Sequence, residues 1–208
     1  VLVVTFVATL TIALEVAIFV GMLASLFFYL NRTTHPSLTP VAPDPDTAQR
    51  RFVTDDDPTR RCPQLDIRRV DGSLFFGAVE HVRDEIEAAR RARPEATHLL
   101  LIGSGINFID VAGCECLAQA ARYVRESGAT LHLCNLKPSV LAALERGGFM
   151  SEIGAQNIHA TKGDAIRTLY RGFDVDTCRR CTARIFTECD PSLPDGTLRA
   201  VSADARNP

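Results

Sequence analysis

Three cysteines near the C-terminus have a spacing that suits metal binding. Cys178, Cys181 and Cys189 form a Cys-x2-Cys-x7-Cys pattern, and thiolates at Cys-x2-Cys spacing are common ligands of zinc and of iron–sulfur clusters. A structural zinc site needs four ligands, so Cys62 or a histidine would have to complete the set. The alternative is a short terminal helix over residues 179–186 that carries ordinary thiols. Because only three thiols lie close together in the sequence, we expect no bound metal and no cofactor.

The second candidate site is a loop that leads into a helix. The apolar run Leu99–Ile102 predicts a buried strand, and the loop that follows it ends at Asp110, which opens an amphipathic helix. Aspartate is a favoured N-cap because its carboxylate accepts hydrogen bonds from the first helical turn, where the helix dipole also favours a negative group. We predict that Asp110 acts as a cap and that asparagine, which keeps one capping oxygen, is tolerated there. The predicted regulatory loop and helix N-terminus consist of Asp110, Val111, Ala112 and Gly113.

This loop does not match a nucleotide-binding motif, and no catalytic set is visible elsewhere. Phe108 stands where a dinucleotide fingerprint needs its third glycine, and the Gly-Lys-Ser/Thr end of a P-loop is absent. The sequence shows no nucleophile elbow and no activated cysteine. We therefore expect a protein that is not an enzyme. The five histidines are scattered singly, without metal-ligand spacing, at His35, His81, His98, His132 and His159.

Composition limits the function classes further. The 208 residues carry 23 basic and 25 acidic side chains, a net charge of −2, so nothing indicates a nucleic-acid partner. The seven cysteines are an odd number and no secretory signal is evident, which favours reduced cytosolic thiols over a disulfide framework. The chain begins with Val1 directly in apolar sequence, so we expect a piece of a longer protein; a complete short gene product is the alternative.

The first 30 residues carry a single charge, Glu15, and are otherwise mostly apolar with a few Thr, one Gly and one Ser, which is typical of membrane-spanning sequence. Thirty helical residues would reach about 45 Å, which exceeds a hydrocarbon core of about 30 Å. We therefore expect one helix to end near Ile12 and a second to run from about Leu14 to Leu30; a single tilted helix is the alternative. Arg32 favours a cytoplasmic exit.

The remainder divides into a linker, a globular domain and a tail. Residues 32–63 are rich in proline and aspartate, so we expect a linker with little regular structure. Residues 64–172 show the alternating pattern of an α/β domain, and residues 173–208 form a cysteine-containing tail that we expect to be partly disordered. A turn at Asp71-Gly72 predicts a hairpin between Leu65–Val70 and Ser73–Phe76. Helical periodicity and strand runs predict helices over about 78–92, 111–127, 138–146 and 162–171, with strands at 99–102, 131–134 and 157–159.

Three motifs in this order resemble those of the STAS domain. They are the Leu-Phe-Phe-Gly-Ala run at 74–78, the Phe-Ile-Asp-Val-Ala-Gly run at 108–113, and Leu136-Lys137-Pro138 followed by the run at 144–149. The resemblance covers about residues 1–170. It implies a small, mainly parallel sheet with helices packed mostly on one side, preceded by a transmembrane helix or helices. In the anti-sigma factor antagonists of this family a phosphorylatable serine follows the aspartate; here Val111 and Ala112 stand there, so that switch is absent.

The Leu-Phe-Phe start and the apolar N-terminal segment resemble the branch carried by SulP-type (sulfate permease) anion transporters. The resemblance implies secondary transport of an anion such as sulfate, bicarbonate or a dicarboxylate, with a cytoplasmic STAS domain that acts by protein–protein contact. The expected partners are the lipid bilayer, an upstream transporter membrane domain, a second copy of the chain and a regulatory protein. The alternative is a membrane-tethered STAS signalling module. The sequence names neither the anion and coupling ion nor the regulatory ligand.

Overall fold

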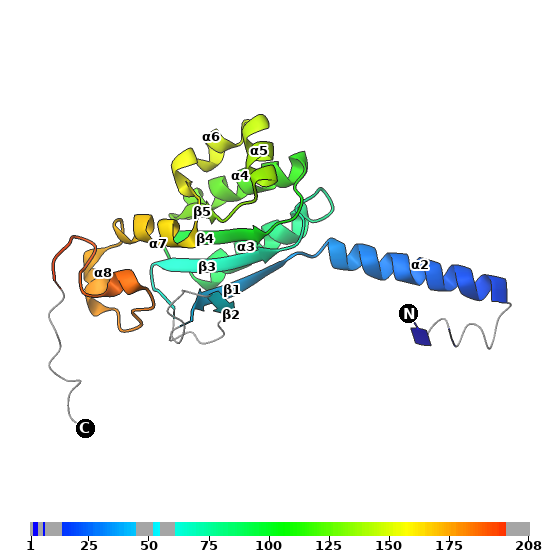
Figure 1. Cartoon of the computed structure of the whole chain (residues 1–208), viewed down its shortest axis with the longest axis horizontal. Helices are drawn as coiled ribbons and strands as arrows, with labels where there is room; N and C mark the ends of the chain where they lie inside the picture. The colour runs from blue at the N-terminus through cyan, green and yellow to red at the C-terminus, as the bar shows by residue number, and fades with distance from the viewer. Residues whose placement is uncertain (1, 4–5, 7–13, 45–51, 55–60, 199–208) are drawn as a thin grey trace, which may run out of the picture.

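The apolar run Leu99–Ile102 lies in the centre of a six-stranded sheet (Figure 1). The computed structural model describes residues 2–3, 6, 14–44, 52–54 and 61–198. The strand order is β2-β1-β3-β4-β5-β6; β3 to β6 are parallel, and β1 is antiparallel to both of its neighbours. The strands are β1 (Ser37–Pro43), β2 (Phe52–Thr54), β3 (Leu65–Asp71), β4 (His98–Gly105), β5 (Thr130–Cys134) and β6 (Ile158–His159).

Helices connect the parallel strands and follow the predicted ranges closely. Apolar residues repeat at helical spacing, and the repeat produces one buried stripe on each long helix. Pro138 lies in the first turn of its helix, where its missing N–H costs nothing, and Thr161 caps the last one by accepting from the Asp164 N–H. The helices are α3 (Val79–Ala92), α4 (Val111–Glu126), α5 (Pro138–Arg146), α6 (Met150–Ile153) and α7 (Lys162–Tyr170).

The sheet has a separate core on each face. Leu99 and Leu101 pack with α3, α4, α5 and α6 on one face, whereas Leu100 and Ile102 pack with α7, β2 and the tail on the other. Most of the helices therefore cover one face of a mixed, mainly parallel sheet, as the α/β fold class expects. The second face is covered mainly by α7 and by shorter segments.

The predicted hairpin is wrong, and so is the absence of regular structure in residues 32–63. Leu74 makes only an isolated parallel bridge to Ile109, and the antiparallel partner of β3 is β1, which lies inside the predicted linker. The prolines of β1 are compatible with a strand because its first half pairs with β3 and its second half with β2, so each half has an open edge. Leu38 and Val41, on either side of Pro40, are buried.

The tail contains a short helix, although not where the sequence places it. Helix α8 spans Val175–Arg180, and a single 3₁₀ turn (η3) spans Thr187–Cys189. Asp174 starts α8 early because its carboxylate accepts from the Thr177 N–H at 2.7 Å. The expected helix over residues 179–186 is therefore wrong by about one turn. The expectation of disorder is untested, because residues 199–208 lie outside the described residues.

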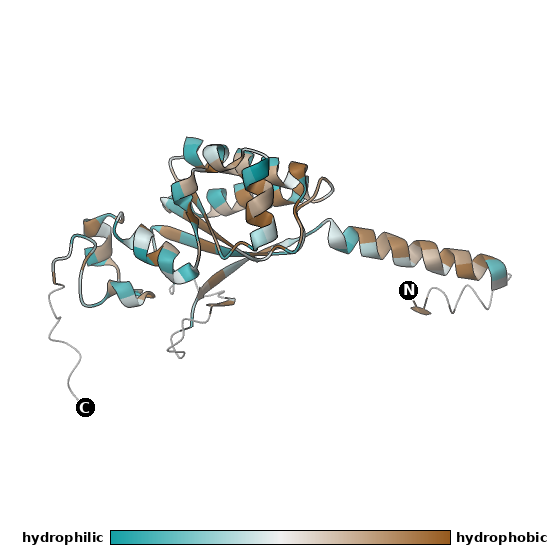
Figure 2. Cartoon of the chain, turned by 45° about the horizontal axis from the view of Figure 1, so that its top comes forward, coloured by the Kyte–Doolittle hydropathy of each residue, from teal (hydrophilic) through white to brown (hydrophobic). Residues whose placement is uncertain are grey.

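Helix α2 (Leu14–Thr33) extends away from the domain and begins where the sequence predicts (Figures 1 and 2). Residues Glu15–Thr33 are long and apolar enough to cross a membrane, since a helix of this length spans about 30 Å. Phe27 and Tyr29 are exposed, and most of the helix surface is hydrophobic in Figure 2. The helix predicted to end near Ile12 falls mostly outside the described residues.

We predict that α2 holds the chain in membranes. After alkaline washing, the full chain should stay in the pellet, because its exposed apolar side chains are stable in lipid and not in water. A fragment of residues 34–198 keeps β1 and the tail on the sheet, and it should stay in the supernatant as the control. Recovery of the full chain as a monomer in the supernatant without detergent would contradict a membrane role for α2.

Candidate functional site

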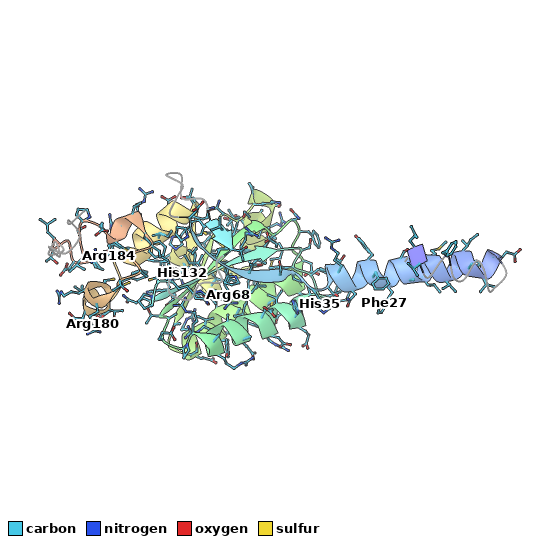
Figure 3. The ribbon with its side chains drawn as sticks, turned by 90° about the horizontal axis from the view of Figure 1, so that it is seen from below. Phe27, His35, Arg68, His132, Arg180 and Arg184 are labelled. Carbon is cyan, nitrogen blue, oxygen red and sulfur yellow. The ribbon has the colours of Figure 1, made fainter. Side chains whose placement is uncertain are left out.

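The predicted loop and helix N-terminus lie at the end of the domain where α2 joins it. Ser37, just after α2, pairs with Asp71, and Asp71 pairs in turn with Gly105. The C-terminal ends of β3 and β4 therefore face the base of α2. At this base the rings of His35 and His81 are in tilted contact, with centroids 4.8 Å apart, and Figure 3 shows His35 at the junction. The site that the sequence predicts thus lies at the end of the domain to which α2 is attached.

One carboxylate organises this end of the domain. Asp110 Oδ1 accepts from the Gly113 N–H at 2.8 Å, which confirms the predicted cap. Its Oδ2 accepts from the N–H of Phe76 at 3.0 Å, a contact between residues 34 positions apart. Backbone bonds complete the link, because the Leu74 N–H donates to Phe108 O and the Asp110 N–H donates to Leu74 O. Both carboxylate oxygens are therefore needed as acceptors.

Position 113 requires glycine because the backbone of the Leu74 segment passes close to it. A Cβ atom on Gly113 would collide with the carbonyl oxygen of Leu74, so only glycine lets the first turn of α4 pack against the Leu74 segment. Val111 is exposed and Ala112 is partly exposed. Neither side chain has a hydroxyl, so this helix N-terminus offers no phosphate acceptor at these two positions.

Three large apolar side chains surround the Asp110 network and remain in solvent. Phe76 is 78% exposed, Phe108 57% and Val111 73%. Backbone bonds tie Phe76 to Asp110 and Phe108 to Leu74, and Val111 directly follows Asp110. We call these three residues the apolar patch. A group of exposed apolar residues on an ordered scaffold is typical of a contact surface. The sequence analysis placed Val111 in the site and missed Phe76 and Phe108.

The cysteine site lies at the opposite end of β3, about 20 Å away along the strand. Cys178, Cys181 and Cys189 line one pocket together with Cys62, which precedes β3. Burial, with a smaller contribution from the nearby Cys181 and Cys189, raises the pKa of the Cys62 thiol to about 12. The expectation of no metal assumed that only three thiols come together, and the structure brings in the fourth. Among the described residues, no three His, Cys, Asp or Glu side chains stand in an arrangement that could hold a metal ion.

A group of three histidines is the feature that the sequence analysis missed. His98, His132 and His159 come from β4, β5 and β6 and lie on the same face of the sheet. His98 Nδ1 is 3.2 Å from His132 Nε2, and His132 Nδ1 is 3.4 Å from His159 Nε2. Phe173 packs against the His98 ring. Spacing in the sequence gave no signal, because only the strand register brings these rings together.

Burial keeps these imidazoles neutral. Desolvation, with smaller contributions from its two histidine neighbours, lowers the pKa of His132 to about 3. Desolvation also lowers the pKa of His98 and of His159, although Asp164 acts on His159 in the opposite direction. Lys162 lies near the buried Cys134 on this face. The trio is therefore a hydrogen-bonded element of the second core in its uncharged form.

We predict that Asp110→Ala lowers the free energy of unfolding more than Asp110→Asn does. Ala removes the cap, which costs about 0.5–2 kcal/mol, and also the bond to Phe76, which is worth about 0.5–1.5 kcal/mol. Asn keeps an acceptor for Gly113 but turns its NH₂ group toward the N–H of Phe76. The stability of the Asn variant should therefore lie between those of the parent chain and the Ala variant, whereas the sequence alone predicts that Asn is tolerated. Urea unfolding of the 34–198 fragment measures this order. Equal stability of the two variants would contradict the double-acceptor role.

We also predict that acid destabilises the second core through the histidines. Their pKa values are lowered in the folded state, so the unfolded chain binds more protons below its ordinary histidine pKa of about 6.5. Stability is therefore complete above about pH 6.5 and falls by about 1.4 kcal/mol per pH unit for His132 as the pH drops toward about 3. His132→Gln should flatten this dependence in urea titrations between pH 7.5 and 4.5. A variant as acid-sensitive as the parent chain would refute this account.

Comparisons with known proteins agree with this architecture. The STAS domain family matches residues 61–165. Sulfate transporter 1.1 of Arabidopsis thaliana is 26% identical over 170 residues, which are 77% of this chain and 26% of that protein. High affinity sulfate transporter 2 of Stylosanthes hamata is 24% identical over 165 residues, which are 75% of this chain and 25% of that protein. The chain thus spans about a quarter of the length of these relatives.

A solved structure shows the same fold. The murine Solute Carrier 26 family member A9 anion transporter, in its inward-facing state, superposes with a TM-score of 0.66 at 22% identity and covers 79% of this chain and 27% of that transporter. The likeness extends beyond the residues that the STAS family matches. Because that family matches residues 61–165, just over half of the chain, the chain belongs to the STAS domain family.

Proposed function

We propose that this chain is the C-terminal membrane segment and regulatory STAS domain of a SulP-like secondary anion transporter. The apolar helix α2 leads within four residues into β1 of the domain, and the relatives that share about three quarters of this chain are named as sulfate transporters. The anion is of the sulfate, bicarbonate or dicarboxylate class. The ion path lies in membrane helices outside these 208 residues, and the STAS domain is cytoplasmic.

The STAS domain acts by contact and not by chemistry. The observation that carries this proposal is the position of the apolar patch, which surrounds the Asp110 network at the end of the domain nearest to α2. An exposed apolar surface beside the membrane junction suits a protein partner, and the upstream membrane domain is the partner within reach. The same patch could serve contact with a second copy or a regulatory protein, which are the other partners expected from the sequence.

The first test is the reading frame upstream of Val1. A continuous frame with several apolar spans of about 20 residues supports the transporter. A start codon immediately before Val1 supports the alternative, a membrane-tethered STAS signalling module that resembles an anti-sigma factor antagonist without its phosphorylatable serine.

The second test is uptake by cells that express the whole frame. A Phe76→Asp, Phe108→Asp double variant should lower uptake of labelled sulfate, bicarbonate or dicarboxylate by about tenfold or more, which corresponds to about 1.4 kcal/mol of lost contact energy. Leu198→Asp is the matched control, because Leu198 is as exposed as Phe76 but lies in the tail. Membrane levels of both variants are measured by blotting. Normal uptake by the patch variant would contradict a role for this surface.

A further inference from the structure

We propose that Cys62, Cys178, Cys181 and Cys189 form a structural zinc site that fastens the tail to the sheet. The four thiols come from three separate segments: the residues before β3, helix α8 with the residue that ends it, and the turn η3. They line one pocket whose other walls include Tyr170 and Phe173. Four cysteines, two of them at Cys-x2-Cys spacing, are the ligand set of a closed tetrahedral zinc site. This proposal rests on the thiols alone and is independent of transport.

Two polar clamps hold the segments that carry these thiols. Arg93, at the end of α3, donates to the carbonyl oxygens of Cys62 and Leu65 at 2.5 and 3.2 Å. Its guanidinium is buried and also lies 3.6 Å from Asp66. The backbone next to the first ligand is thus fixed to the sheet by a charged side chain, which is the pre-organisation that a metal site requires.

The second clamp joins the first ligand segment to the tail. The side chain of Gln64 accepts from the Asp174 N–H at 2.7 Å and donates to the Asp174 carbonyl oxygen at 3.1 Å. The same NH₂ group is 3.4 Å from Cys178 Sγ. An amide that donates to a ligand sulfur is the kind of outer-shell contact that stabilises a metal-bound thiolate. These contacts cross 110 positions of sequence and converge on the cysteine pocket.

A metal at this site would stabilise the folded tail. Between Arg171 and Leu198 the described structure has one helix of six residues, α8, and one 3₁₀ turn, and such short segments form little stable structure by themselves. Yet Phe173, Phe186 and Leu193 of this stretch are buried in the second core. A metal that bridges Cys62 to three tail thiols would supply the cross-link that disulfides supply in oxidised proteins.

Two arginines lie at this end of the domain, and one of them, Arg184, is also 3.8 Å from Asp190. Four thiolates around Zn²⁺ carry a net charge of about −2, and Arg184 lines the same pocket. Arg180 at the end of α8 lies close by at this end of the molecule (Figure 3). Because the thiols do not yet enclose a metal position, binding must draw the four sulfur atoms inward to about 2.3 Å from the ion, with the release of their protons.

The test uses the full chain, purified in detergent from cells grown with zinc and without chelators. Elemental analysis should find about one zinc per chain, and Cys62→Ser and Cys181→Ser should each lower the content by about tenfold or more. Cys116→Ser is the matched control, because Cys116 is buried in the other core, with its Sγ 3.7 Å from Val79 O. It should keep the metal.

A second measurement avoids variants that fail to fold. In the unmodified chain, removal of the metal with a chelator should make four more thiols reactive, and added Zn²⁺ should protect them again with release of protons. Three results would overturn the proposal: less than about 0.1 zinc per chain with thiols that zinc does not protect, iron in place of zinc, or equal zinc in the parent chain and the Cys62→Ser, Cys181→Ser double variant. None of these results bears on the uptake experiment.

Discussion

The structure depends on the burial of strand β4 on both faces. Every side chain from Leu99 to Ile102 is almost fully removed from water, and each such burial contributes roughly 1.5–3 kcal/mol. This strand is stable only if both faces of the sheet are covered. The amphipathic helices α3 and α4 cover one face continuously. The other face has the single longer helix α7, so the remaining cover comes from short pieces such as Phe52 and Phe186, which lie outside long helices.

The second face of the sheet is covered by short segments, and these need specific side-chain contacts to hold them in place. The structure has such contacts next to the sheet. Arg93 and Gln64 bind backbone atoms of segments with little secondary structure. The histidine trio binds three neighbouring strands through their side chains. Polar groups in such positions are stabilising only when each is satisfied. The second face therefore depends on pairing between specific side chains, whereas the first depends mainly on apolar area.

This difference explains what the sequence could predict. Helices and parallel strands were visible because their apolar periodicity is local. The turn at Asp71-Gly72 was misread because the Gly72 N–H donates to Gly105 O, and β1 had already taken the antiparallel edge of β3. The Asp110 cap was visible because it spans three residues. The bond from Phe76 to Asp110 and the histidine trio were not visible, since only the tertiary fold brings these residues together. Cys62 was named as a possible fourth ligand, but only the fold shows that it lines the same pocket as the tail cysteines.

The two ends of the sheet present different backbone groups because the parallel strands all run in the same direction. At the C-terminal ends of the parallel strands the following helices begin, so backbone N–H groups converge there and a carboxylate, Asp110, satisfies them. At the N-terminal ends α3 terminates, and the buried Arg90 donates to the carbonyl oxygens of Arg93 and Ala96 just after the helix. Arg93 in turn donates to the carbonyl oxygens of Cys62 and Leu65 at the start of β3. The end of the domain next to α2 is thus organised around an anion and leaves apolar surface for a partner. The opposite end is held by buried guanidinium groups and contains the cysteine pocket.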